Sequence, residues 1–197
     1  MRKRLTSLLV GNTIASLGIT MLIKSGFGCF ALTAANMALA NWFNITIGTT
    51  GMILETIMVL IATYKGEGIG LTSIVNALYG SIMIDVFNAL LPSSPFMVLG
   101  LLIIPIGWAL MGKAGYGDTG SNILMNVILK STGKSITLIR GIEECIFLTL
   151  GLLGAREAVT WFTIALTFGL GYLMEFEYKL IKYDPTEIKH QYLIKRK

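Results

Sequence analysis

The sequence predicts an all-α integral membrane protein in which six transmembrane helices form two inverted three-helix repeats, each with a short re-entrant or broken helix. Three observations carry this prediction: an apolar composition, apolar runs of membrane-spanning length, and an internal repeat. The 197 residues are 54% hydrophobic and only 14% charged, with a mean hydropathy of +0.71. A soluble domain carries about a quarter charged residues. The chain is therefore expected to lie in a lipid bilayer as a single membrane domain.

Six apolar segments approach the length of about 20 residues that a bilayer crossing needs. Their approximate ranges are 6–23, 45–64, 69–91, 96–112, 136–154 and 157–178. The first follows the basic stretch Met1-Arg2-Lys3-Arg4, as a secretory signal does. It runs to Ile23, however, and no obvious small-residue cleavage site follows it. We therefore expect this segment to be retained as a span.

Two further apolar segments, 29–42 and 118–131, are too short to cross. Fourteen residues of helix reach about 21 Å, whereas the hydrocarbon core is about 30 Å thick. Each segment follows a Gly-x-Gly string, Gly26-Phe27-Gly28 or Gly115-Tyr116-Gly117. Such segments are tolerated at membrane depth where they are buried in protein or line a water-filled cavity. Both are therefore predicted to be re-entrant or broken helices.

The two halves of the chain match each other at an offset of 89 residues without a gap. Matched pairs include Gly11 with Gly100, Gly18 with Gly107, Lys24 with Lys113, Glu55 with Glu144, and Gly80 with Gly169. Because three spans per half is an odd number, the halves must lie in opposite orientations. Inverted repeats are typical of transporters whose site lies near the midplane, between the halves. Repeat 1 is expected at about 6–91 and repeat 2 at about 96–178.

The placement of basic residues favours six crossings, because cytoplasmic loops are enriched in Lys and Arg. Six crossings put these basic positions on one side: the N-terminus, Lys65, Lys113, Lys130, Lys134 and the tail 179–197. The turn 92–95 falls on the other side without charge, and Arg156 is the exception. The net charge of +5 therefore marks topology and does not indicate nucleic-acid binding. Both termini are expected on the cytoplasmic side of the cell membrane.

Glu55 and Glu144 are the leading candidates for a binding site, because they occupy the same position in both repeats. Each lies about ten residues into its span, where an ionisable group costs at least a few kcal/mol and needs a partner or a function. Around a two-fold axis the two carboxylates could approach each other across a central cavity. A coupled pair of carboxylates suits proton coupling or cation binding. The alternative is that they cap helix ends or pair with Arg140.

Three further polar residues complete the predicted substrate- or ion-binding set. Arg140 lies four residues before Glu144 and three before Glu143, within helical reach of both. It either neutralises this cluster or clamps an anionic substrate through its planar guanidinium. Asp118 opens the second short segment, where it either caps the helix or contacts a substrate, and Asn122 follows one turn later.

Other notable residues favour structural interpretations. Cys29 and Cys145 have neither metal-ligand nor disulfide spacing, and both are predicted to be small core residues. Asp85 is expected to be an interfacial or packing carboxylate. Small residues on one face of the first span suit close helix contact, either inside the molecule or with a second copy. No metal or cofactor is expected, because His190 is the one histidine and no phosphate-loop motif is present.

Several strings together resemble the YitT/YczE family of small bacterial multi-pass membrane proteins, over nearly the whole transmembrane length. They are Gly68-Ile69-Gly70-Leu71-Thr72, Asn76-Ala77-Leu78-Tyr79-Gly80, Ile84-Asp85, Gly115-Tyr116-Gly117-Asp118, and Thr132-Gly133-Lys134-Ser135 running into Arg140 and Glu144. Related members often carry a Pro-Trp pair where this chain reads Cys29-Phe30-Ala31. The resemblance implies a bacterial multi-pass membrane protein without a settled biochemical activity.

The leading functional prediction is a secondary transporter or exporter of a small solute, proton-coupled through Glu55 and Glu144. A second prediction is a substrate-binding membrane subunit energised by a partner ATPase. A third is an intramembrane aspartyl protease, since Gly115-Tyr116-Gly117-Asp118 carries its Gly-x-Gly-Asp string and Asp85 is the available second carboxylate. The glycines recur in the first half without the acid, which favours a non-enzymatic interpretation. The expected partners are lipid, the solute and either a second copy or another membrane protein.

Overall fold

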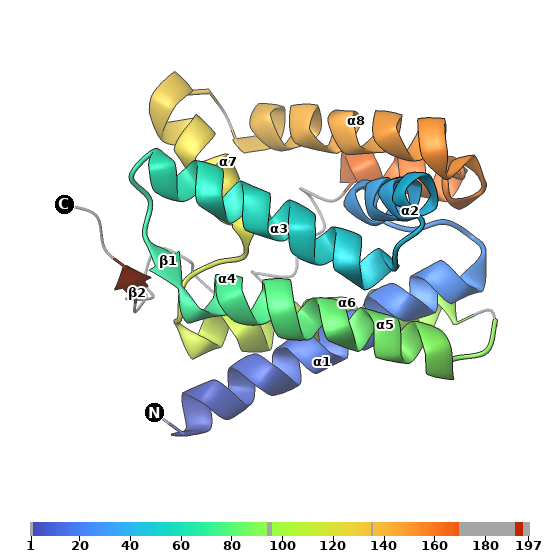
Figure 1. The fold of residues 1–197 in the computed structure, drawn as a ribbon, viewed down its shortest axis with the longest axis horizontal. Helices are drawn as coiled ribbons and strands as arrows, with labels where there is room; N and C mark the ends of the chain where they lie inside the picture. The colour runs from blue at the N-terminus through green and yellow to red at the C-terminus, as the bar shows by residue number, and fades with distance from the viewer. Residues whose placement is uncertain (1, 94–95, 135, 170–191, 195–197) are drawn as a thin grey trace.

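The described part of the chain consists of helices, their connecting turns and one short pair of strands (Figure 1). The computed structural model describes residues 2–93, 96–134, 136–169 and 192–194. Its helices are α1 (Arg2–Ser25), α2 (Ala31–Phe43), α3 (Ile47–Tyr64), α4 (Leu71–Val75), η1 (Asn76–Gly80), α5 (Ser81–Leu90), α6 (Met97–Ala114), α7 (Gly120–Thr132), α8 (Ile136–Gly154) and η2 (Arg156–Ala158). Residues 161–169 are also helical, and the strands are β1 (Ile69–Gly70) and β2 (Tyr192–Ile194).

Four helical runs in the described residues are long and apolar enough to cross a membrane. They are Arg2–Ser25, Ile47–Tyr64, Leu71–Leu90 and Met97–Ala114. The third run is α4, η1 and α5 joined end to end, with a π-helical turn at its middle. These runs confirm the first four predicted spans by length and composition. In α8, three ionisable side chains lower the apolar character, and residues 170–178 of the predicted span 157–178 lie outside the described residues.

The most extensive helix contact is the crossing of α1 with α6, which joins the two halves of the chain. It depends on glycine at four positions. A Cβ on Gly11 would lie 2.6 Å from the backbone oxygen of Gly107, and one on Gly107 would lie 2.6 Å from that of Gly11. Gly18 and Gly100 oppose each other in the same way. The small-residue face of the first span therefore packs inside the molecule.

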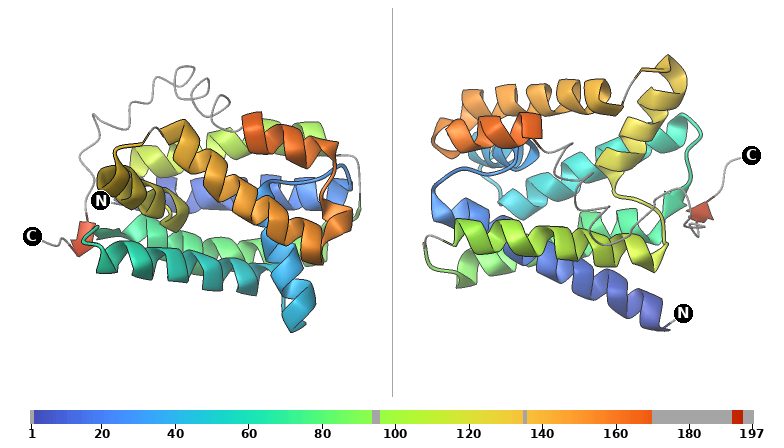
Figure 2. Two further views of the ribbon diagram at one scale, coloured as in Figure 1. Left: turned by 90° about the horizontal axis from the view of Figure 1, so that it is seen from above. Right: turned by 180° about the vertical axis from the view of Figure 1, so that it is seen from behind.

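The repeat is visible in the bounds of the helices. Shifted by 89 residues, the ends of α2 coincide with those of α7, and α3 coincides with α8 to within one residue. Each short helix packs on the long helix of the other half, since α2 contacts α8 and α7 contacts α3. Figure 1 places α2 and α7 toward opposite ends of the molecule, and the left view of Figure 2 shows α2 running across the long helices. The short segments are thus helices that each pack on the opposite half.

The two Gly-x-Gly strings have the same backbone conformation. Gly26 and Gly28 have φ of 69° and 113°, and Gly115 and Gly117 have φ of 67° and 88°. Side chains with a Cβ rarely adopt positive φ, so glycine is required to end the first helix of each half and turn into the short one. The strings are therefore geometry shared by both repeats.

Several basic side chains meet at the end of the molecule where α1 begins. Arg4 donates from Nε to the Ala114 backbone oxygen at 2.7 Å, which ties the start of α1 to the end of α6. Lys130 of α7 pairs with Glu67, which follows α3. Strand β1 pairs antiparallel with β2 from the C-terminal tail at the same end (Figure 1). This clustering agrees with the predicted single basic side.

The two cysteines differ from each other. Cys29 is buried, as predicted for a core residue, whereas Cys145 is exposed on α8. The prediction for Cys145 was wrong because an apolar segment of a membrane protein also presents a face to lipid. Apolar surroundings in the sequence do not distinguish that face from the protein interior.

Candidate functional site

A cavity of about 110 Å³ lies at the centre of the helices. Its walls come from α1, α2, α3, the run from η1 to α5, and Trp108 of α6. Polar side chains line part of it: Ser16, Thr33, Asn36, Glu55, Asn76 and Ser81. The remaining lining is mostly apolar. A mostly apolar cavity with a few convergent polar groups is the usual form of a small-molecule site.

Glu55 projects from α3 and caps the start of α7. Its Oε1 accepts a hydrogen bond from the Gly120 backbone N–H at 2.6 Å and from Asn76 Nδ2 at 2.8 Å. The first backbone N–H groups of a helix lack partners within the helix and carry a partial positive charge, so a carboxylate is stabilised there. Gly120 also permits the close approach, because a Cβ there would lie 2.7 Å from the Glu55 backbone oxygen. Glu55 therefore joins the two repeats while it lines the cavity.

A chain of side-chain amides and hydroxyls continues from Glu55 to α1. Asn76 lies at the first position of the π-helical turn, and its Oδ1 accepts from Asn12 Nδ2 at 3.2 Å. Ser16 donates to the Gly80 backbone oxygen at 3.1 Å, at the other end of the same turn. Our sequence reasoning did not select these residues. The available signal was asparagine within apolar spans, which needs a hydrogen-bonding partner at that depth.

Asn36 is another lining residue that the sequence did not single out. Its Oδ1 atom is buried and has no hydrogen-bond partner within the described structure. Buried polar atoms are rarely left in this state, and each such atom calls for an explanation. An acceptor that lines a cavity is available to a donor on a bound molecule.

Arg140, Glu143 and Glu144 form a second polar group, between α7 and α8. Arg140 Nη1 donates to Glu143 Oε2 at 2.8 Å and to Ser121 Oγ at 2.6 Å. Its Nε lies 3.7 Å from Glu144 Oε1. Glu144 is only 3% exposed, and its Oε2 has no hydrogen-bond partner among the described residues. The prediction that Arg140 lies within reach of both carboxylates is confirmed.

The expectation that Glu55 and Glu144 face each other as a matched pair is not what the structure shows. Among the described residues no hydrogen bond or ion pair joins them, and each has its own partners. The reason lies one helical turn earlier, where the second half has Arg140 and the first half has Gly51. Ser121 links the two groups, since its hydroxyl donates to Glu143 at 3.1 Å and its backbone neighbour Gly120 donates to Glu55.

Asp118 and Asn122 lie beside the site but do not line the cavity. The N-cap position of α7 is Thr119, and the carboxylate that receives the α7 backbone N–H comes from Glu55. Both roles predicted for Asp118, helix capping and substrate contact, stay predictions. The Asp118 backbone oxygen accepts from Ser73 Oγ at 2.7 Å, which fixes the turn before α7 against α4.

Asp85 caps the start of α3. Its Oδ1 accepts from the Gly48 backbone N–H at 2.8 Å, and its Oδ2 accepts from Thr46 Oγ1 at 2.6 Å. Ser73, which donates to the Asp118 backbone oxygen, lies twelve residues before Asp85 in the same helical run. Twelve residues of helix separate Ser73 from Asp85 by about 18 Å along the axis. Two aspartates must lie close together to share a proton. The structure therefore does not bring Asp85 and Asp118 together as an aspartyl dyad.

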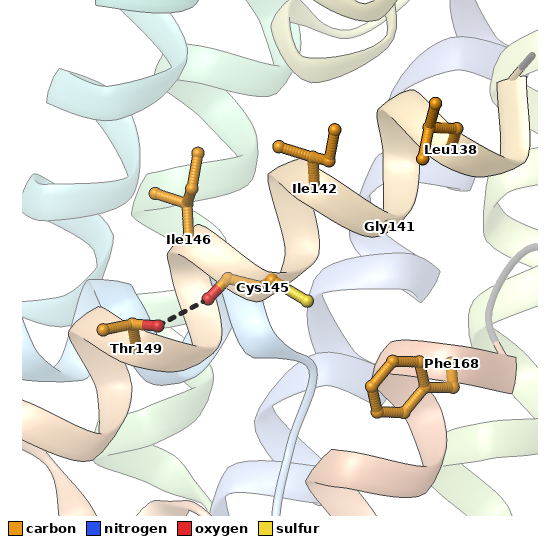
Figure 3. A pocket seen from close by; sticks show the side chains of 7 residues that line it. All are labelled: Leu138, Gly141, Ile142, Cys145, Ile146, Thr149 and Phe168. Atoms are coloured by element: carbon orange, nitrogen blue, oxygen red, sulfur yellow. Dashed lines mark hydrogen bonds between the residues drawn. The ribbon is translucent and has the colours of Figure 1, made fainter.

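A larger groove of about 630 Å³ runs between α8 and residues 161–169 (Figure 3). Leu138, Ile142, Ile146 and Phe168 give it an apolar lining. The Thr149 hydroxyl is engaged locally, since it donates to the Cys145 backbone oxygen at 2.8 Å. Such a surface suits lipid chains, and it lacks the convergent polar groups of the central cavity. The central cavity is therefore the candidate functional site.

Comparison with known proteins identifies one family. A model described as a family of unknown function (DUF6198) matches residues 2–96, which comprise the first repeat. No curated protein and no solved structure matches the chain. The resemblance to the YitT/YczE family stays a prediction.

Proposed function

We propose that the protein is a secondary transporter or exporter of a small solute in the bacterial cytoplasmic membrane. The observation that carries the proposal is the central cavity, whose polar side chains come from the first half, because Trp108 of the second half also lines it and Glu55 in its wall holds the start of α7. In transporters built from repeats, the substrate site lies at such a junction, beside a broken helix whose end carries partial charge. Here the first N–H of α7 donates to the Glu55 side chain, and a π-helical turn interrupts the run from Leu71 to Leu90.

The proposed topology has six crossings and an inverted repeat. The matching bounds of α2 with α7 and of α3 with α8 support two related halves. The start of α1 and the end of α6 meet at Arg4, which donates to the Ala114 backbone oxygen. Basic residues at this end of the molecule agree with a cytoplasmic surface, which is enriched in Lys and Arg. Single cysteines placed at Arg4, Arg156 and Lys130 provide a test by labelling in intact cells. We expect Arg156→Cys alone to react with a membrane-impermeant reagent, and an odd number of crossings would refute the topology.

Coupling to a proton gradient is part of the proposal. The two polar groups hold three carboxylates, Glu55, Glu143 and Glu144, against one guanidinium, Arg140. This excess of acidic groups at membrane depth is typical of proton and cation pathways. Ser121 lies between the groups and provides a physical link from the cavity to Glu144.

The test is uptake by proteoliposomes that contain only this chain. Vesicles with an internal pH of 7.5 are placed in a mixture of amines, amino acids, sugars and carboxylic acids at pH 5.5, without ATP. We expect at least one compound to accumulate, and Glu55→Gln to abolish that accumulation, with Glu67→Gln as the control outside the cavity. High-affinity binding without uptake, restored by a copurifying ATPase, would contradict this proposal and support a substrate-binding subunit.

A further inference from the structure

We propose that the central cavity binds a small organic ammonium ion, an assignment that rests on the proposed transport function and specifies its substrate class. The first reason is the charge of the lining. Glu55 is the one ionisable side chain among the described residues that line the cavity, and those residues include no lysine, arginine or histidine. A cation entering this space gains attraction, whereas an anion meets a carboxylate with no compensating base.

The second reason is that Glu55 has no ion-pair partner among the described residues. Its partners are the Gly120 backbone N–H and the Asn76 amide, which are neutral donors. The start of α7 contributes a partial positive charge equivalent to about half a unit. Arg140 lies four residues before Glu144, the counterpart of Glu55 in the second half, but its guanidinium pairs with Glu143 and Glu144. Glu55 is only 6% exposed, so its charge is left incompletely balanced at depth.

The third reason is the unpartnered acceptor on Asn36. Its Oδ1 is buried without a hydrogen bond, and it shares the cavity with Glu55. An ammonium group carries three N–H donors and no acceptor. Glu55 and Asn36 offer two acceptors, and the hydroxyl of Thr33 or Ser81 offers a third within the same lining. The donor-only chemistry of an ammonium ion matches an acceptor-rich wall.

The rest of the lining determines the size and character of the ligand. Trp108, Leu54, Met58 and Ile19 contribute apolar surface, so the ligand carries a short hydrocarbon part. The face of an indole ring also attracts cations. A volume of about 110 Å³ corresponds to three or four water molecules at the liquid share of about 30 Å³ each. An ammonium ion with about three carbons fits this space.

The second repeat does not build an equivalent site. Residues 89 positions after Asn36 and Asn76 are Met125 and Ala165, and the position that matches Gly51 is Arg140. A cation would meet the Arg140 guanidinium there. The ammonium site is therefore specific to the first half and to its carboxylate.

The test compares three probes of nearly equal size at pH 7 and equal ionic strength: propylammonium, 1-propanol and propionate. Binding to the purified, detergent-solubilised protein is measured by calorimetry and by the shift of the thermal midpoint. We expect propylammonium to raise the midpoint in a concentration-dependent manner, and the other two probes to leave it unchanged at the same concentration. An equal response to 1-propanol or propionate would overturn the assignment.

Two variants test the residues, and a third is the control. We expect Glu55→Gln and Asn36→Ala each to raise the Kd for propylammonium at least tenfold. Glu67→Gln is expected to stay within about twofold of wild type, because Glu67 lies outside the cavity and pairs with Lys130. If Glu55→Gln does not fold, Asn36→Ala still decides, since the Asn36 Oδ1 makes no hydrogen bond that the fold would lose. An unchanged Kd in Asn36→Ala would overturn the proposed site.

The outcomes also separate this inference from the proposed function. Uptake of another solute by proteoliposomes, without a response to propylammonium, would refute the ammonium assignment and leave transport standing. Binding of propylammonium with the expected losses in the variants, but without uptake of any solute, would refute transport and support the ammonium site.

Discussion

Replacing Gly107 by alanine tests the central contact between the two halves. In α6, the new Cβ would lie 2.6 Å from both the Gly11 backbone oxygen and the Ala15 backbone nitrogen, and 2.8 Å from the Ala15 Cβ. All three neighbours belong to α1, and two of them are backbone atoms that cannot move aside by a change of rotamer. The helices must therefore separate by several tenths of an ångström along their whole crossing.

The expected cost is about 1–3 kcal/mol, the range found when an extra methyl group is forced into a well-packed interior. For a chain of this length, each kcal/mol lowers the thermal midpoint by about 2–4 °C. We expect Gly107→Ala to lower the midpoint by about 2–12 °C, measured by the temperature dependence of the monodisperse peak in size-exclusion chromatography. The reciprocal variant Gly11→Ala should have a similar effect, because its Cβ would meet the Gly107 backbone oxygen at 2.6 Å.

Gly141 is the matched control, since it also lies inside an apolar helix. A Cβ at this position meets nothing within 4 Å. Gly141→Ala should therefore be neutral, or stabilising by up to about 1 kcal/mol through helix propensity. The double variant Gly11→Ala/Gly107→Ala should cost less than the sum of the single changes, because one separation of the helices accommodates both methyl groups. Equal midpoints for Gly107→Ala and Gly141→Ala would refute the close crossing.

Three further substitutions distinguish buried charge from surface charge. Arg140→Met leaves Glu143 and Glu144 without their guanidinium and should lower the free energy of unfolding by about 3 kcal/mol. Adding Glu144→Gln should recover part of this loss. An Arg140→Met variant as stable as wild type would contradict the cluster. Asp85→Ala removes the acceptor at the start of α3 and should cost about 1 kcal/mol in thermal unfolding. Lys130→Ala should cost less than about 1 kcal/mol, because this side chain is 71% exposed, and a larger loss would point to a buried network at that position.

The helices were predictable because their limits depend on local chemistry. Apolar runs end where glycine with positive φ or a polar cluster interrupts them, and this placed α3 and α7 within two residues of the predicted 45–64 and 118–131. The two Gly-x-Gly turns were predictable for the same reason, since glycine at matched positions reports matched backbone geometry. Residues 170–178 of the predicted last span lie outside the described residues.

The site was only partly predictable because its contacts join distant segments. The repeat identified Glu55 and Glu144 as candidates, but their partners are set by packing. Nothing local in the sequence indicates that Glu55 receives the Gly120 N–H, a residue 65 positions later. The repeat does not mark Asn36, because its match in the second half is Met125.

The distribution of repeated and unrepeated residues separates the scaffold from the site. The glycines matched between the halves, such as Gly18 and Gly107, lie where the backbones of α1 and α6 approach closely, because both halves must meet the same steric limit. The polar residues around the cavity differ between the halves, since Asn36 and Asn76 have apolar counterparts and Arg140 replaces a glycine. A symmetric site would present the same chemistry to both sides of the membrane. The asymmetry instead gives one half an acceptor-lined cavity and the other half a paired ionic cluster, and Ser121 connects the two through its hydroxyl and the adjacent Gly120 backbone. In the proposed transporter, solute binding and charge balance thus belong to different halves of the chain.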